Sequence, residues 1–117
     1  MIIAAVDDLL FSSKIRTIAR QVGADLAFAR TPDEILQKLR AERPSLLMID
    51  LNSAKAEPIA TIHAIRGDQQ LSGVRILGFA SHVQVDVIRA ARDAGADEVL
   101  PRSAFAAKLP DILSGKS

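Results

Sequence analysis

The stretch Leu46-Leu47-Met48-Ile49-Asp50-Leu51-Asn52 decides the fold of this chain. An uninterrupted apolar run leads directly into an aspartate. A short, continuous apolar run is typical of a strand that is buried on both faces, as in a parallel sheet covered by helices on each side. Ligands of such sheets collect at the carboxyl ends of the strands. We therefore predict that Asp50 lies at the end of a central strand, at the edge where a site can form.

Strands and helices are predicted to alternate along the whole chain. Apolar runs predict strands at residues 2–6, 25–29, 45–50, 74–79 and 96–100. Helical spacing of apolar residues predicts helices that end near Gly23, Arg43, Arg66 and Gly95, followed by a last helix that carries Phe105 and Leu109. Such alternation predicts an α/β fold: a flavodoxin-like, doubly wound, five-stranded parallel sheet of order 2-1-3-4-5, with helices on both faces. Residues 1–117 are expected to form a single domain without an output domain.

Details of the helix ends are also predicted. Thr31 is expected to cap the second helix, with Glu34 completing a capping box. Ser81 is a candidate cap for the fourth helix. Ser12 is expected on the solvent-facing side of the first helix. Pro110 lacks a backbone donor, which predicts that the last helix is either kinked or begins late.

Composition excludes several classes of function. The chain carries 15 basic and 14 acidic residues, so its net charge of +1 does not favour nucleic acid or an anionic membrane. There is no cysteine, which excludes thiol nucleophiles and zinc–thiolate sites. No apolar run approaches the roughly 20 residues of a membrane helix, and no secretion signal precedes Asp7. We expect a soluble cytoplasmic protein.

Three carboxylates are predicted to meet at one edge of the sheet. Asp7 and Asp8 end the first strand and Asp50 ends the third, and these strands are neighbours in the predicted order. Packed carboxylates repel unless a cation neutralises them, and Mg²⁺ prefers oxygen ligands of this kind. A simpler interpretation is that Asp7 or Asp8 caps the first helix. That interpretation does not account for both residues together with Asp50.

These residues resemble the receiver domain of two-component response regulators, over nearly the whole chain. Val6-Asp7-Asp8 is similar to the acidic pair of that family, and Leu47-Met48-Ile49-Asp50-Leu51-Asn52 to the strand with its phospho-accepting aspartate. Ile65-Arg66 falls in the family's third helix, and Ala91-Arg92-Asp93-Ala94-Gly95-Ala96 is similar to the segment before its fifth strand.

The resemblance implies a signalling module and not an enzyme. Asp50 would accept a phosphoryl group from a histidine kinase or phosphotransfer protein, which would face residues 12–16. Asp8 and Asp50 would bind Mg²⁺ directly, Asp7 through water, and Asn52 through its backbone carbonyl. A downstream protein target and a homodimer are the other partners that the resemblance implies.

The sequence departs from the family at the positions that normally switch. Ala80 stands where the family has a hydroxyl residue, and Ser81 follows it; Val99 stands at the position of the switch aromatic. Arg102 takes the place of a lysine, and its planar guanidinium is not equivalent to an ammonium. The family's proline follows that lysine, whereas Pro101 precedes Arg102, so the isomer of its peptide bond is left open.

Three functions remain open from the sequence. The first is a phosphorylatable receiver that signals through protein contacts. The second is a pseudo-receiver, a phosphorylation-independent binding module in which Arg102 pairs with Asp50 and replaces the metal. The third is an enzyme or nucleotide binder on the same fold, which is disfavoured because Asp7-Asp8-Leu9-Leu10 stands where a Gly-rich phosphate loop would lie.

Overall fold

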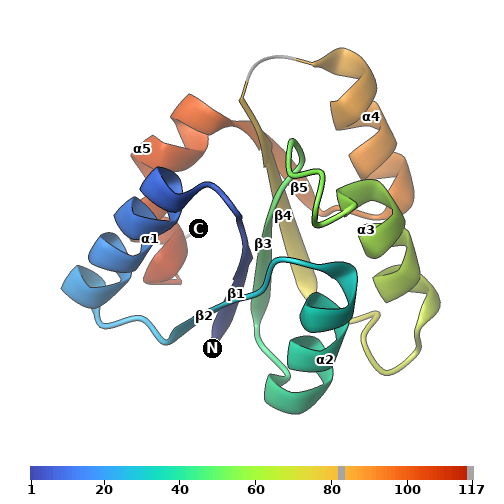
Figure 1. Ribbon diagram of the computed structural model, residues 1–117, viewed down its shortest axis with the longest axis horizontal. Helices are drawn as coiled ribbons and strands as arrows, with labels where there is room; N and C mark the ends of the chain where they lie inside the picture. Colours follow the sequence, from blue (N-terminus) through green and yellow to red (C-terminus); the bar gives the residue numbers. More distant parts are fainter. Residues whose placement is uncertain (82–83, 116–117) are drawn as a thin grey trace.

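The structure is a computed structural model that describes residues 1–81 and 84–115 of the chain. Five strands alternate with five helices in the described residues (Figure 1). The strands are β1 (Ile2–Ala5), β2 (Leu26–Phe28), β3 (Leu46–Asp50), β4 (Arg75–Ala80) and β5 (Glu98–Pro101). The helices are α1 (Leu9–Val22), α2 (Pro32–Glu42), α3 (Pro58–Gly67), α4 (Val85–Ala94) and α5 (Arg102–Leu113).

All neighbouring strands pair in parallel, in the order β2-β1-β3-β4-β5. The predicted sheet order is therefore confirmed. The central strand β3 lies between β1 and β4, with Met48 opposite Ala4 on one side and Leu77 on the other. Every residue of β3 is buried, including its terminal Asp50. This central position explains why the chain needs an unbroken apolar run before the aspartate.

Two hydrophobic cores lie on opposite faces of the sheet. Successive residues of a strand point to opposite faces, so Ala4 contributes to one core and Ile3 to the other. The first core packs the sheet against α1 and α5, with Ile15 and Phe105 fully buried. The second packs it against α2, α3 and α4 (Figure 1). These layers fix the carboxyl ends of β1 and β3 side by side.

The helix starts confirm part of the capping prediction. The Thr31 hydroxyl accepts a hydrogen bond from the Glu34 N–H, as expected. The Glu34 carboxylate accepts from the Arg30 N–H, so the reciprocal bond falls one residue before the cap. The prediction that Ser81 caps the fourth helix is wrong, because Gln84 occupies the residue before α4. His82 and Val83, the two residues between Ser81 and Gln84, lie outside the described residues.

One other local prediction is wrong, and one of the two alternatives predicted for the last helix is excluded. Ser12 is buried and not on the wet face, and its hydroxyl lies 3.4 Å from the Val6 carbonyl, to which it donates. The last helix does not begin late: α5 starts at Arg102, immediately after β5, and includes Pro110. Within the described part of the chain every peptide bond is trans, including the one before Pro101.

Candidate functional site

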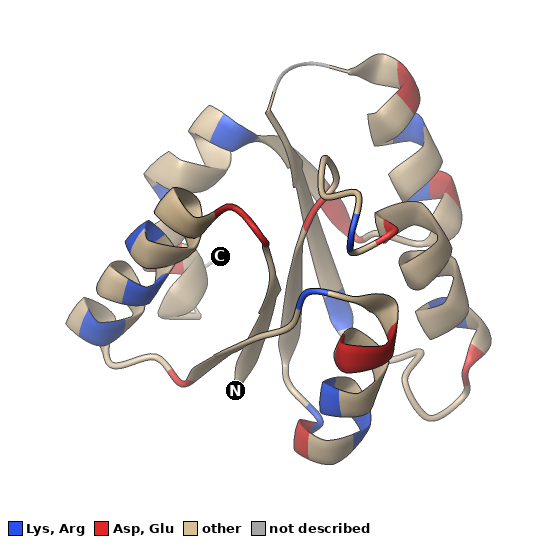
Figure 2. Ribbon diagram, viewed as in Figure 1, with Lys and Arg blue, Asp and Glu red and all other residues tan. Residues whose placement is uncertain are grey.

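The acidic residues and a basic residue meet at the carboxyl edge of the sheet. Asp7 and Asp8 lie between β1 and α1, and Asp50 is the last residue of β3. Figure 2 shows the acidic β1–α1 segment in red and the basic start of α5 in blue at this same edge. The basic residue is Arg102, the first residue of α5. Parallel strand ends on one side of the sheet bring these four residues together from distant parts of the sequence.

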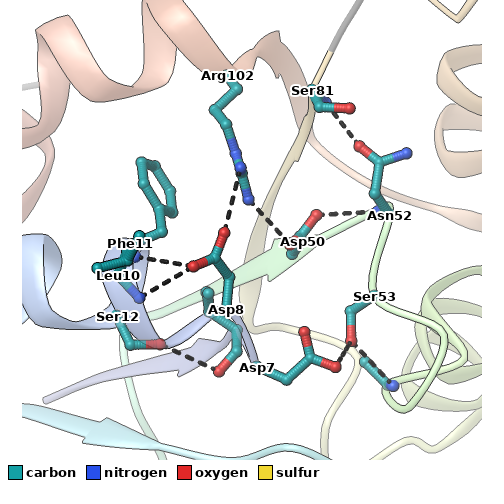
Figure 3. A network of polar contacts seen from close by, with 12 residues as sticks. Asp7, Asp8, Leu10, Phe11, Ser12, Asp50, Asn52, Ser53, Ser81 and Arg102 are labelled. Atoms are coloured by element: carbon teal, nitrogen blue, oxygen red, sulfur yellow. Dashed lines mark hydrogen bonds and ion pairs between the residues drawn. The ribbon is translucent and has the colours of Figure 1, made fainter.

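The Asp50 carboxylate is buried and has two polar partners (Figure 3). One oxygen, Oδ1, accepts a hydrogen bond of 2.9 Å from the Asn52 N–H. The other, Oδ2, lies 3.3 Å from Nη2 of Arg102. Burial raises the pKa of Asp50 above its usual value; the Asn52 N–H and Arg102 oppose this rise, and the charges of Asp7 and Asp8 add to it. A buried carboxylate beside two others thus depends on nearby positive charge to stay ionised.

Asp8 has two roles at once. Its Oδ1 accepts hydrogen bonds from the Leu10 and Phe11 N–H groups, so Asp8 is the N-cap of α1. Its Oδ2 lies 3.5 Å from Nη1 of Arg102. The Phe11 N–H is the main cause that holds the pKa of Asp8 below its usual value, with Arg102 also lowering it and desolvation opposing. The capping interpretation is therefore confirmed for Asp8, without removing that residue from the site.

Arg102 bridges the two carboxylates. The ion pair with Asp50 that the pseudo-receiver hypothesis predicts is present, and a second pair joins Arg102 to Asp8. The guanidinium carbon lies 4.4 Å from the centre of the Phe11 ring and 5.9 Å from that of Phe79. Cations are attracted to aromatic faces at these distances. The Nε atom of Arg102 is buried and has no hydrogen-bond partner among the described residues.

Asp7 points away from the bridging arginine. Its Oδ2 accepts a 3.1 Å hydrogen bond from the Ser53 hydroxyl, which in turn accepts one from the Ala56 N–H (Figure 3). The three carboxylates thus lie at one edge of the sheet, but only Asp8 and Asp50 are paired with Arg102. Among residues 1–81 and 84–115, no group of three or more acidic, histidine or cysteine side chains is arranged to hold a metal ion. The metal role of each residue stays a prediction.

The carboxylate pair nevertheless has the chemistry of a cation position. Asp8 and Asp50 each direct one oxygen at a single positive group, the guanidinium of Arg102. The guanidinium occupies the position that a metal ion would take between two carboxylate oxygens, and such oxygens are the ligands that Mg²⁺ prefers. The residues fit a divalent ion on the condition that Arg102 moves aside.

Of the positions expected to switch, Ala80 and Ser81 lie at the carboxyl end of β4 and Val99 lies within β5. Ala80 is fully buried at the end of β4 and pairs regularly with Pro101, so no bulge brings the Ser81 hydroxyl to its place. Ser81 reaches the site through its backbone, because its N–H donates a 2.6 Å hydrogen bond to Oδ1 of Asn52. Val99 is buried in β5, opposite Gly78.

Two residues of the site were missed from the sequence. Ser53 holds Asp7, and its place three residues after Asp50 was the only available signal. Gln84 lies just before α4, and its Oε1 accepts a 2.7 Å hydrogen bond from Nδ2 of Asn52. Nothing in the local sequence marks Gln84, because the contact joins residues 32 positions apart.

A cavity in the described part of the molecule lies away from this site. It has a volume of about 370 Å³ and lies at the amino ends of the strands. Ile2, Leu46 and Leu77 line it, together with Ile112 and Leu113 of α5.

Comparison with known proteins identifies related folds. No protein-family model matches the chain. The transcriptional activator protein ExaE of Pseudomonas putida is 31% identical over 82 residues, which cover 70% of this chain and 37% of that protein. The chain thus matches well under half the length of this curated relative.

Solved structures share the whole fold. A putative response regulator from Chloroflexus aurantiacus superposes with a TM-score of 0.85 at 17% identity, covering 98% of this chain and 94% of that chain. A response regulator protein from Burkholderia pseudomallei, solved with a phosphorylated aspartic acid, a calcium ion and citrate, superposes with a TM-score of 0.80 at 20% identity, covering 96% and 65%. At these identities the comparisons show a common fold.

No helix in the described residues is long and apolar enough to cross a membrane.

Proposed function

We propose that this chain, which has the fold of response regulator receiver domains, accepts a phosphoryl group on Asp50 and signals through contacts with another protein. One observation carries the proposal: the buried Asp50 carboxylate ends the central strand, with Asp8 beside it and the Arg102 cation directed at it. The phosphorylated aspartic acid in the Burkholderia pseudomallei structure, which has the same fold, supports this assignment.

The transfer would use Asp50 as the nucleophile. A bond forms between a carboxylate oxygen of Asp50 and phosphorus, the bond from phosphorus to the donor's leaving group breaks, and the leaving group keeps the electron pair. Arg102 is positioned to bind the negative charge of the transferred phosphoryl group. A guanidinium donates two parallel hydrogen bonds to phosphoryl oxygens as readily as to a carboxylate. Arg102 would thus exchange Asp50 for the oxygens of the new phosphoryl group.

A divalent cation would be held by Asp8 and Asp50, with Asp7 through water and the Asn52 carbonyl as further ligands. Mg²⁺ would supply neutralisation of the phosphoryl charge. The bridging of Asp8 and Asp50 by one cationic group supports this assignment, since it identifies two oxygens that share a positive partner. The calcium ion in the Burkholderia pseudomallei structure is consistent with a divalent cation on this fold.

The partners follow from this chemistry. A histidine kinase or phosphotransfer protein would donate the phosphoryl group, and a downstream protein would receive the signal, with a homodimer as a further assembly. Leu9 and Leu10, at the start of α1, are 71% and 86% exposed beside the pocket. Adjacent exposed leucines at the rim of a reactive site favour a protein donor there.

A second function is favoured by the Arg102–Asp50 ion pair itself. With Arg102 neutralising Asp50, and with Ala80 offering no hydroxyl, the chain would act as a pseudo-receiver that binds its partner without phosphorylation. The two functions differ in one respect that can be measured: only the first requires Asp50 to react.

Intact-mass spectrometry after treatment with acetyl phosphate, with and without Mg²⁺, separates the two. The phosphorylatable receiver gains one phosphoryl group in a Mg²⁺-dependent manner, and Asp50→Ala abolishes the gain. Asp25→Ala, an exposed aspartate before β2, is the matched control and keeps it. A folded wild-type chain that gains no phosphoryl group would refute phosphorylation and leave the pseudo-receiver.

A further inference from the structure

Asn52 connects the acid pocket to the start of α4 through three hydrogen bonds. Its N–H donates to Oδ1 of Asp50 at 2.9 Å. Its Oδ1 accepts from the Ser81 N–H at 2.6 Å, and its Nδ2 donates to Oε1 of Gln84 at 2.7 Å. Figure 3 shows the first two of these bonds, with Asn52 lying between Asp50 and Ser81. One residue, through its backbone N–H and its side chain, therefore ties the end of β3 to Ser81 and Gln84.

The Gln84 side chain is committed to this connection. Gln84 occupies the N-cap position of α4 but makes no capping hydrogen bond to the helix. In contrast, Asp8 and Thr31 use their side chains to cap α1 and α2. The Gln84 carbonyl accepts the first helical hydrogen bond, from the Ile88 N–H at 2.9 Å. Fixing Gln84 therefore fixes the first turn of α4.

We propose that Asn52 and Gln84 form a clasp that transmits a change at the Asp50 carboxylate to the first turn of α4. The clasp supplies a connection that Ala80 and Val99 do not, since neither side chain carries a hydrogen-bonding group. A change that moves Oδ1 of Asp50 moves the backbone N–H of Asn52 that donates to it. The side-chain amide of Asn52 then moves as well, and with it Ser81 and Gln84. This inference goes beyond the proposed function, because it holds for any perturbation of Asp50.

Amide hydrogen exchange, followed by NMR, tests the clasp in the unphosphorylated protein. The probes are the N–H groups of Ser81 and Ile88, with the amides of β3 reporting global stability. Gln84→Met removes the acceptor and is expected to accelerate exchange at Ile88 about fivefold, as for the loss of one net hydrogen bond. Gln84→Glu keeps an acceptor oxygen and is expected to preserve slow exchange. Asn52→Ala is expected to accelerate both probes.

The coupling to Asp50 is tested by a double-mutant cycle. Asp50→Ala is expected to accelerate exchange at Ser81 and Ile88 in the wild-type background, and to add nothing in the Asn52→Ala background. Unchanged exchange at the two probes in Asp50→Ala would overturn the proposal, as would an equal acceleration in both backgrounds. No step involves a phosphoryl donor, so the outcome is independent of whether Asp50 is phosphorylated.

Discussion

Arg102 and Asp50 are 52 positions apart in the sequence, and the guanidinium of the first lies 3.3 Å from the carboxylate of the second. The same guanidinium lies 3.5 Å from Asp8 and packs on the Phe11 ring. Arg102 is thus held from three directions by groups that all suit a cation. The charge of the pocket, and what it can bind, depends on whether this arginine stays or moves.

The raised pKa of Asp50 predicts how stability depends on pH in metal-free buffer. Burial raises this pKa above 3.8 in the folded chain, so the folded state binds the proton more tightly than the unfolded state. The protonated Asp50 therefore contributes fully to stability at a pH below its pKa in the unfolded chain. This contribution is lost as the pH rises through the pKa of Asp50 in the folded chain. Asp50→Asn keeps an amide oxygen for the Asn52 N–H and removes the charge. We expect this variant to gain stability over wild type at neutral pH, but not near pH 4.

Urea unfolding across this pH range measures the effect. Asp25→Asn removes one negative charge at the opposite edge of the sheet and controls for net charge. A loss of stability in Asp50→Asn that is larger at neutral pH than in acid would show that the Arg102 ion pair outweighs burial.

Phe11→Leu tests the aromatic contact of Arg102. Leucine keeps an apolar side chain but removes the ring face that attracts the guanidinium, 4.4 Å away. We expect a stability loss of about 1 kcal/mol, together with a further rise in the pKa of Asp50, because Arg102 is held less firmly. NMR titration of the Asp50 carboxyl carbon measures the pKa.

Phe28→Leu is the matched control for this change. The Phe28 ring lies 4.9 Å from the guanidinium carbon of Arg16, away from the pocket. The control is expected to lose stability without changing the titration of Asp50. Identical Asp50 titration in both variants and in wild type would mean that the Phe11 ring does not position Arg102.

Gly95→Ala tests the clamp that holds the end of α4 against α3. Gly95 has φ of +121°, and an added Cβ would overlap Cγ of Arg66. Arg66 donates to the Gly95 carbonyl and to Asp97, so it cannot retreat without losing both bonds. We expect a destabilisation of about 1–3 kcal/mol, measured by thermal or urea unfolding. Gly67→Ala, where the Cβ meets nothing within 4 Å, is expected to be neutral or slightly stabilising. Equal stability of the two variants would contradict this account of Gly95.

The order of strands and helices was predictable because hydrophobic periodicity is a local property. The run from Leu46 to Asp50 already requires burial on both faces, and helices that end at Gly23 and Gly95 follow from turn chemistry. Ser12 was misplaced because spacing assigns a polar residue to the wet face, whereas its hydroxyl is buried against the Val6 carbonyl. Pro110 did not delay α5, since burial of Leu109 and Ile112 beside it outweighs one missing backbone bond.

The site was predictable in its residues and less so in their pairing. Strand ends bring Asp8 and Asp50 together, but the sequence does not say which cation they share. The direction of Asp7 depends on Ser53, and that of Asn52 on Gln84, through contacts between loops that no local pattern records. Side-chain partners across loops are set by tertiary packing, which spacing along one segment cannot predict.

A magnesium titration followed by NMR tests most directly whether Asp8 and Asp50 share one cation position that Arg102 fills in the metal-free chain. We expect saturable shifts at the Asp8 and Asp50 amides in wild type, and none in Asp50→Asn. Arg102→Met is expected to bind about fivefold more tightly, as for the loss of a competing ion pair of about 1 kcal/mol. Arg16→Met removes the same charge elsewhere and is expected to bind as wild type does. Affinity in Arg102→Met no higher than in Arg16→Met, or no saturable shift in any variant, would contradict a shared cation position.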